Sequence, residues 1–187
     1  MGSEMCIRDS LCLEFTSKSN SIGEGIGKGL NEVIQLAEDG NWKGLVIGNN
    51  AKQFSVGANL MNIGMLAMQK QYDVVERFVD DFQSINMRIR TSKIPVVVAT
   101  QGYVFGGGCE ISMQCDAGIY AAESYIGLVE VGVGLLPGGG GTKEFALRAS
   151  DDFFEGDVQN PTLINYFKSI ATAAVSTSAY ELSLIHI

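Results

Sequence analysis

The chain has 187 residues and a mass of 20.0 kDa, which is enough for one domain with a sizeable core. Its 13 Lys and Arg residues against 21 Asp and Glu residues give a formal net charge of -8, which argues against non-specific nucleic-acid binding, since that binding needs the opposite charge. Hydrophobic residues make up 46%, yet no run reaches the roughly 18 consecutive apolar residues of a membrane span, so a globular domain is predicted.

Strands and helices alternate along the first half of the chain. A short apolar run predicts a strand over residues 11–15, and apolar residues at helical spacing predict a helix over 24–39. A buried strand is expected over 44–48, followed by a loop over 49–59. The clearest helix spans 72–90, because its apolar residues form a single stripe.

The second half continues the alternation and makes the chain an α/β protein of one domain. We expect a Val-rich strand over 95–100, a turn at Gln101 and Gly102, and a helix that begins within residues 106–108. The remaining predicted elements are strands over 117–121 and 125–128, a loop over 129–137, a helix from 138–141 to about 148, an acidic connector over 151–160 and a helix from Pro161 to about 173.

The residue types limit the chemistry. The single histidine, His186, stands next to the last residue, so a Ser-His-Asp triad or a His-rich metal site is not expected. The four cysteines form no Cys-x-x-Cys pair, which argues against a metal or redox site and favours a reducing compartment, the cytoplasm or an organelle matrix. Carboxylates, thiols and backbone groups are left to do any chemistry.

Three glycine-rich segments are candidates for ligand binding. Residues 23–29 lack the G-x-G-x-x-G spacing of a dinucleotide site. Residues 138–141 are followed by Thr and Lys in the wrong order for a phosphate-binding loop, so a tight turn into a helix is favoured. Residues 106–108 lie between a strand and a helix, where free N–H groups suit a developing negative charge, although a packing turn is an equal explanation.

Two glutamates strengthen the third segment as a site. Glu110 lies three residues after Gly107, and Glu130 follows in an otherwise apolar loop. Taken singly, Glu110 could be a dipole-favoured residue at a helix start and Glu130 an exposed loop residue. Together with the glycine run and the loop over 54–58, they favour a functional pair of carboxylates.

Separated motifs, in order, resemble the enoyl-CoA hydratase/isomerase (crotonase) family. The matching stretches are GLVIG (44–48), FSVGANL (54–60), IPVVVATQGYVFGGGCE (94–110), IGLVE (126–130) and GLLPGGGGT (134–142). The amino-acid sequence over 128–141 most resembles the hydratase part that is fused to 3-hydroxyacyl-CoA dehydrogenases. We therefore expect a partial crotonase-like domain over 11–181 of a longer protein, with non-native ends at 1–10 and 182–187.

The resemblance implies a fold and a site. The fold would be a spiral of ββα units with its C-terminal helices truncated. The N–H groups of Ala58 and Gly107 would form an oxyanion hole, and Glu110 and Glu130 would be catalytic. Asn59 departs from the Asp that relatives usually have. The residues expected to bind substrate are Ser55, Gly57, Leu60, Gly106, Pro137 and Gly138.

The resemblance also implies an activity. The expected reaction is hydration of 2-enoyl-CoA thioesters to 3-hydroxyacyl-CoA in fatty-acid β-oxidation, and having both glutamates favours it, because isomerase relatives often keep only one. No metal and no cofactor are expected in this domain; NAD would belong to a fused part outside it, and the intact protein would be a homo-oligomer. The alternatives are a Δ3-Δ2-enoyl-CoA isomerase, a thioester hydrolase or lyase of the same fold, or a catalytically silent binding or assembly module.

Overall fold

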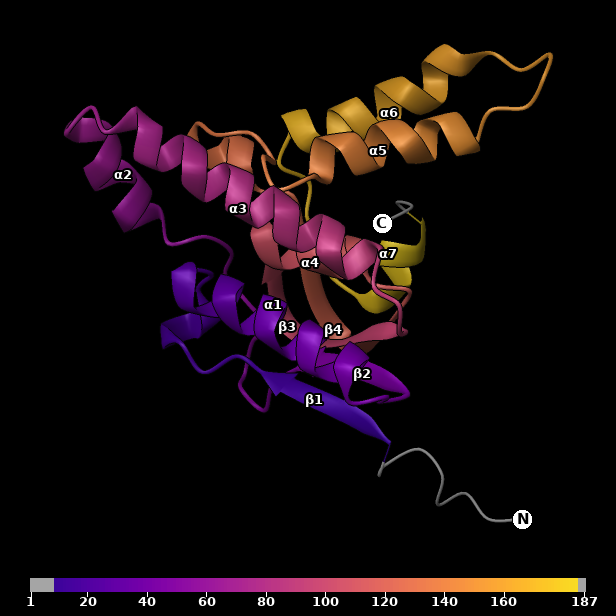
Figure 1. Cartoon of the computed structure of the whole chain (residues 1–187). Helices are drawn as coiled ribbons and strands as arrows, with labels where there is room; N and C mark the ends of the chain where they lie inside the picture. Colours follow the sequence, from indigo (N-terminus) through magenta and orange to yellow (C-terminus); the bar gives the residue numbers. More distant parts are fainter. Residues whose placement is uncertain (1–8, 185–187) are drawn as a thin grey trace, which may run out of the picture.

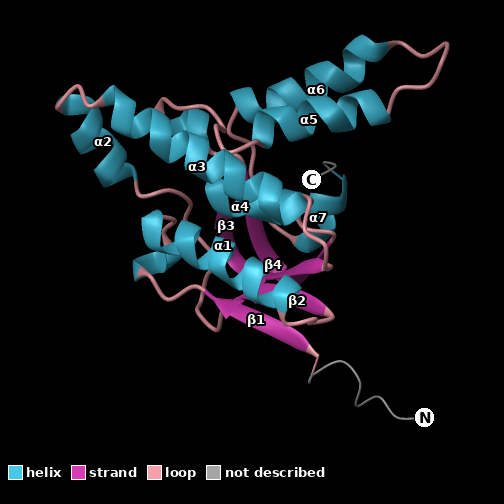
Figure 2. Ribbon diagram, viewed as in Figure 1, coloured by secondary structure: helices cyan, strands magenta, loops and turns pink. Residues whose placement is uncertain are grey.

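A computed structural model describes residues 9–184, in which a parallel sheet lies below most of the helices in the view of Figure 1. Within these residues the strands β1 (Ser10–Glu14), β2 (Gly44–Gly48), β3 (Val96–Phe105) and β4 (Ala117–Gly127) form a four-stranded sheet in chain order (Figure 2). Parallel neighbours need crossover connections, and helices supply them here. The α/β class is confirmed.

The helices that follow the strands build layers on the sheet (Figure 1). Helix α1 (Glu24–Asp39) packs against β1 and β2, and α4 (Gly107–Gln114) packs against β3 and β4. Helix α3 (Tyr72–Arg90) lies across both helices.

An ion pair joins α3 to α1. The Arg88 guanidinium donates to both carboxylate oxygens of Glu38, at 2.7 and 2.6 Å. This bond is the main reason why the pKa of Glu38 falls to about 2.

Shorter helices surround this body. Helix α2 (Leu60–Met68) packs on α3, and α7 (Ala179–Leu184) packs on β4. Helices α5 (Gly141–Asp151) and α6 (Gln159–Ala171) pair with each other and project from the body in Figure 1. Two single-turn 3₁₀ helices, η1 (Lys18–Asn20) and η2 (Glu130–Val133), lie in the connections.

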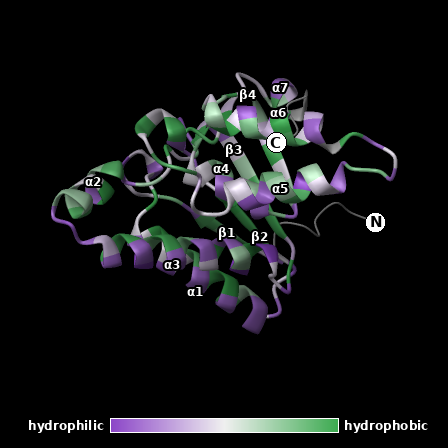
Figure 3. Ribbon diagram, turned by 90° about the horizontal axis from the view of Figure 1, so that it is seen from above, coloured by the Kyte–Doolittle hydropathy of each residue, from purple (hydrophilic) through white to green (hydrophobic). Residues whose placement is uncertain are grey.

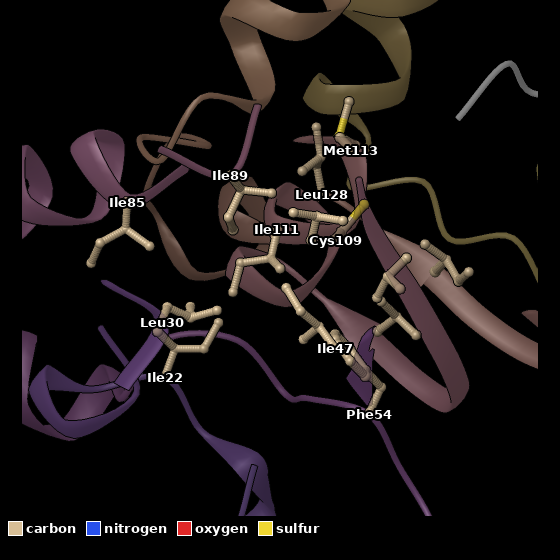
Figure 4. Packing of buried hydrophobic residues seen from close by; sticks show 14 of the residues in the cluster. Ile22, Leu30, Ile47, Phe54, Ile85, Ile89, Cys109, Ile111, Met113 and Leu128 are labelled. Atoms are coloured by element: carbon tan, nitrogen blue, oxygen red, sulfur yellow. The ribbon is translucent and has the colours of Figure 1, made fainter. Parts of the chain in front are cut away.

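The core lies between the sheet and the helices. Helix α3 buries Phe82, Ile85 and Ile89 at helical spacing, while its other faces carry the hydrophilic residues visible in Figure 3. At the start of β3 buried and half-buried residues alternate, and the face that carries Val96 and Val98 packs in the core. Figure 4 shows side chains of α1, α3, α4 and the strands meeting in one cluster.

Sequence periodicity predicted the bounds of α1, β2 and α3 correctly, but the turn predicted at Gln101 and Gly102 is wrong. The chain continues there as β3, with a bulge between Thr100 and Gly102. Gly102 has a φ of +58°, and a side chain on it would collide with the backbone carbonyl of Lys52. The residue types of a turn therefore mark a bulge inside a strand.

The two separate strands predicted over 117–121 and 125–128 are wrong in the same way. Beyond the bulge, β3 pairs residues 102–105 with 124–127, which makes β4 a single strand. Isolated bridges from Ser55 to Val104 and from Ser176 to Ile126 extend this second half of the pairing. The loop predicted over 129–137 contains η2, and the helix predicted from Pro161 begins two residues earlier, at Gln159.

The segments expected to be non-native, 1–10 and 182–187, lie largely outside the described residues. Within the described part, Ser10 begins β1 and Leu182 packs in the core. His186 and Cys6 lie outside it. Among residues 9–184, no helix has the length and the apolar character that crossing a membrane requires.

Candidate active site

A cavity of about 190 Å³ lies where the loop after β2, the start of α4, η2 and α3 meet. Its wall is mainly apolar, with two carboxylates, Glu110 and Glu130, in it. Its other lining residues include Val56, Gly57, Ala58, Leu60, Ile63, Val75, Phe78, Val79, Phe82, Gly106, Gly107, Val129, Val133, Leu135, Leu136, Gly138 and Gly139.

The loop after β2 presents the N–H group of Ala58. Ile22 donates its N–H to the carbonyl of Gly57 at 2.8 Å and accepts the N–H of Asn59 at 3.1 Å. This bridge uses the residues on either side of Ala58 and leaves its own N–H pointing away. In the described part of the chain, that N–H has no hydrogen-bond acceptor.

The start of α4 presents a second N–H group. Gly107 is the first residue of the helix, and Glu110 is the first whose N–H finds a helical acceptor, the carbonyl of Gly106 at 2.9 Å. Gly57, at a φ of +87°, lets the two segments approach, since a side chain on it would come within 3.4 Å of the Gly107 nitrogen. Two N–H groups without acceptors therefore line one cavity.

Glu110 projects from the first turn of α4 and is only 2% exposed. Its Oε1 accepts the N–H of Gly141 at 2.9 Å. Burial raises the pKa of this carboxyl, and hydrogen bonds from the N–H groups of Gly141, Gly139 and Gly140 oppose the rise. The start of α5 thus partly stabilises the ionised form of a buried acid.

Glu130 lies at the start of η2. Its Oε2 is buried without a hydrogen-bond partner in the described residues, and a side chain on Gly106 would come within 2.9 Å of its Oε1. Burial, followed by the charge of Glu110, raises its pKa to about 7. Of the two carboxyls, Glu130 therefore begins to lose its proton only as the pH approaches 7, while Glu110 has the donors that favour ionisation.

Eight of the ten residues predicted for the site line this cavity, and two do not. Ser55 is buried behind the loop, where its hydroxyl donates to the carbonyl of Asn20 at 2.7 Å and accepts the N–H of Gly57 at 3.1 Å. Pro137 is also buried, and a side chain on Gly141 would meet it at 2.9 Å. Both residues support the backbone around the cavity rather than forming its wall.

Sequence reasoning missed the contact between Glu110 and residues 139–141. The tight turn into a helix is present, but it also wraps around the carboxylate: a side chain on Gly139 would collide with the ring of Phe82 and reach Glu110 Oε2. No local signal marks this contact, because the two segments are about thirty residues apart in sequence.

A larger hollow of about 330 Å³ lies between α1 and α3 and shares Phe78 and Phe82 with the first cavity. It lacks both carboxylates of the pair and both free N–H groups, so the smaller cavity is the better candidate site. Among the described residues, no three His, Cys, Asp or Glu side chains are grouped to hold a metal ion.

Comparisons with known proteins agree with this geometry. Residues 12–156 match the family model described as enoyl-CoA hydratase/isomerase. A probable 3-hydroxyacyl-CoA dehydrogenase of Bacillus subtilis is 42% identical over 173 residues, which cover 92% of this chain and 21% of that protein. The mitochondrial enoyl-CoA hydratase of Pongo abelii is 32% identical, over 66% of this chain and 41% of the relative. The chain thus spans less than half the length of either curated relative.

A solved structure shows the same fold. The enoyl-CoA hydratase from Polaromonas sp. JS666 superposes with a TM-score of 0.80 at 20% identity, over 95% of this chain and 65% of the other. At this identity the likeness carries the fold alone, and it confirms the predicted crotonase-like architecture.

Proposed function

The chain belongs to the enoyl-CoA hydratase/isomerase family, and on that basis we propose that its cavity hydrates 2-enoyl-CoA thioesters to 3-hydroxyacyl-CoA. The observation that carries the proposal is the combination, in one apolar cavity, of two N–H groups without acceptors and two carboxyls, one of which accepts backbone N–H groups while the other has an oxygen without a partner among the described residues. Water adds across the double bond of the 2-enoyl thioester and gives a 3-hydroxyacyl thioester. Enzymes that catalyse such additions are hydro-lyases.

The N–H groups of Ala58 and Gly107 bind the thioester carbonyl oxygen. When water adds to C3 of the enoyl group, negative charge develops on that oxygen. Donors fixed in advance stabilise this charge, and removing one such donor typically costs about 3–4 kcal/mol. Binding the charge at the start of α4 adds the favourable end of the helix dipole.

The carboxylates handle the protons. Ionised Glu110 takes one proton from water as the oxygen forms its bond to C3, and protonated Glu130 gives its proton to C2. The pKa of about 7 at Glu130 supports its role as the acid. The donors at the start of α5 support Glu110 as the base. Because the two carboxyls interact, they titrate as a coupled pair.

The same proposal covers the wider protein. We infer that residues 11–181 are the hydratase domain of a longer chain that acts in fatty-acid β-oxidation, in the cytoplasm or an organelle matrix. The name of the Bacillus subtilis relative supports a fused 3-hydroxyacyl-CoA dehydrogenase part, to which NAD would belong. The hydratase domain itself needs acyl-CoA as substrate and no further cofactor, and the intact protein is expected to form a homo-oligomer.

The test uses the complete protein that contains this sequence and crotonyl-CoA. We expect loss of the enoyl thioester absorbance, a strong decrease in Glu110→Gln, and no change in Glu123→Gln, a control at an exposed glutamate of β4. Isomerisation of a 3-enoyl-CoA without hydration would replace the proposal with the isomerase. Failure of both reactions would favour a silent module.

A further inference from the structure

Two amide side chains of α3 lie behind residues 138–141. Gln83 donates its Nε2–H to the carbonyl of Gly138 at 2.6 Å, and Asn86 donates its Nδ2–H to the carbonyl of Gly139 at 2.8 Å. The two side chains are three residues apart and share one face of the helix. They anchor successive carbonyls of the turn that contacts Glu110.

Peptide geometry connects these anchors to the carboxylate. In a planar trans peptide, the carbonyl of one residue and the N–H of the next point in opposite directions. An anchor on the carbonyl of Gly138 therefore directs the N–H of Gly139 away from α3, and an anchor on the carbonyl of Gly139 does the same for the N–H of Gly140. Both N–H groups act on Glu110, as does that of Gly141.

The turn needs such anchors because the backbone of four successive glycines is flexible. Four successive glycines have little conformational preference, so their peptide planes can rotate at low cost. Gly140 adopts a φ of +132°, and the space at Gly139 excludes a side chain. Rigidity must therefore come from outside the turn, and α3 supplies it.

The burial of Asn86 indicates that its role is this hydrogen bond. It is 1% exposed, and its Oδ1 has no hydrogen-bond partner among the described residues. A buried amide that satisfies only half of its polar atoms is a poor choice for stability, and an apolar residue of similar size would avoid the penalty. Gln83, in contrast, is exposed, so water can replace its donor.

We propose that Asn86 is a positioning residue, which holds the turn over 138–141 so that its N–H groups meet Glu110 and orient it as the base. The inference rests on the proposed hydration reaction. It adds that a residue of α3 outside the cavity controls one member of the carboxylate pair.

The test compares Asn86→Leu with the parent in the complete protein. We expect kcat for crotonyl-CoA hydration to fall about 10- to 100-fold, as a small misplacement of a catalytic group does, with KM changed less than about threefold. Loss of the N–H contacts raises the pKa of Glu110, so the acidic limb of the pH–rate profile moves to higher pH. Gln83→Leu should show a smaller loss, and Gln35→Leu, at an exposed amide of α1, none.

Two further measurements separate positioning from a merely structural role. In the Glu110→Gln background, Asn86→Leu should lower the residual rate little, because the residue acts through Glu110. Hydrogen–deuterium exchange over 138–141 should accelerate in Asn86→Leu, and this readout holds even if the protein catalyses another reaction. Unchanged exchange and kcat, or an equal loss in both backgrounds, would overturn the inference. If Asn86→Leu does not fold, Asn86→Ser, whose hydroxyl is too short to reach Gly139, takes its place.

Discussion

Two glycine runs, 106–108 and 138–141, each lead into a helix at the same cavity, yet they use their free N–H groups in opposite ways. At the start of α4 the N–H of Gly107 has no helical acceptor and faces the cavity. At the start of α5 the N–H of Gly141 is already bonded to Glu110. One helix start is left open for a ligand, and the other stabilises a charge that belongs to the protein.

The difference shows that a glycine-rich helix start has no fixed function. Both runs supply orphan donors and a positive dipole end. What decides their role is whether a buried carboxylate is within reach. Glu110 connects the two, because it stands in the first turn of one helix and receives donors from the start of the other.

Closing the open helix start should have the largest effect. In Gly107→Val, the added Cβ would come within 3.0 Å of the ring of Phe82, which lines the cavity, and within 3.1 Å of Ile22, so these neighbours would have to shift. We expect kcat/KM for enoyl-CoA hydration to fall by more than about 10³-fold while the fold persists. Gly29→Ala, in open space on α1, is the matched control. An unchanged kcat/KM would remove Gly107 from the site.

The second-largest decrease in activity is expected from removing the charge of either carboxylate. Glu110→Gln and Glu130→Gln should each lower kcat for hydration by about 10²–10⁴-fold, since an amide keeps the shape but cannot exchange the proton. The double variant should be far less than multiplicatively worse, because the two groups act as a unit. Near-parental hydration by Glu110→Gln would favour a one-base isomerase.

Burying Glu130 next to Glu110 should lower the free energy of unfolding at neutral and alkaline pH. The folded state holds the pKa of Glu130 at about 7, above its ordinary 4.5. Below pH 4.5 both states are protonated and no penalty exists; as pH rises from 4.5 to 7, the unfolded state ionises first and folding loses stability. Glu130→Gln should therefore raise the free energy of unfolding by about 1–3 kcal/mol at pH 8.

Urea denaturation of the parent and Glu130→Gln at pH 8 and pH 4 measures this difference. The gain should disappear at pH 4. An equal gain at both pH values would show that packing, and not ionisation, is responsible.

The two helices also differ in what covers them, and this should affect solution behaviour. All residues of α4 are buried, whereas α5 leads into the projecting pair with α6, where Leu163, Ile164 and Phe167 are 51%, 46% and 66% exposed. We expect residues 1–187 expressed alone to self-associate. Sedimentation velocity measures this, and Phe167→Ser should reduce it. A monodisperse monomer would contradict the prediction.

The sequence predicted elements best where one periodicity ran without interruption. The stripes of α1 and α3 gave their bounds correctly. Gly102 misled because glycine serves a turn and a bulge alike, and only the pairing partner distinguishes them. Helix α2 was missed: its start depends on the side chain of Asn59, which accepts the N–H of Asn62, and most of its residues are exposed.

The candidate site, too, was predicted only in part. The sequence motifs predicted that Glu110, Glu130 and the two N–H groups belong to one site, and in the structure they line one cavity. Asn86 and residues 139–141 were not predicted as partners of Glu110. Their contacts join α3, α4 and α5, and such contacts depend on how the helices pack rather than on any local pattern.

The two carboxyls are carried by elements of unequal local stability. Glu110 stands on a helix whose residues are all buried, while Glu130 stands on a single 3₁₀ turn whose residues are half-buried or exposed. Segments with few buried contacts open at a lower free-energy cost than the core does. On warming, the turn that bears Glu130 should therefore open first and separate the pair while the sheet remains intact. The protein would then lose its activity reversibly at temperatures below its melting transition.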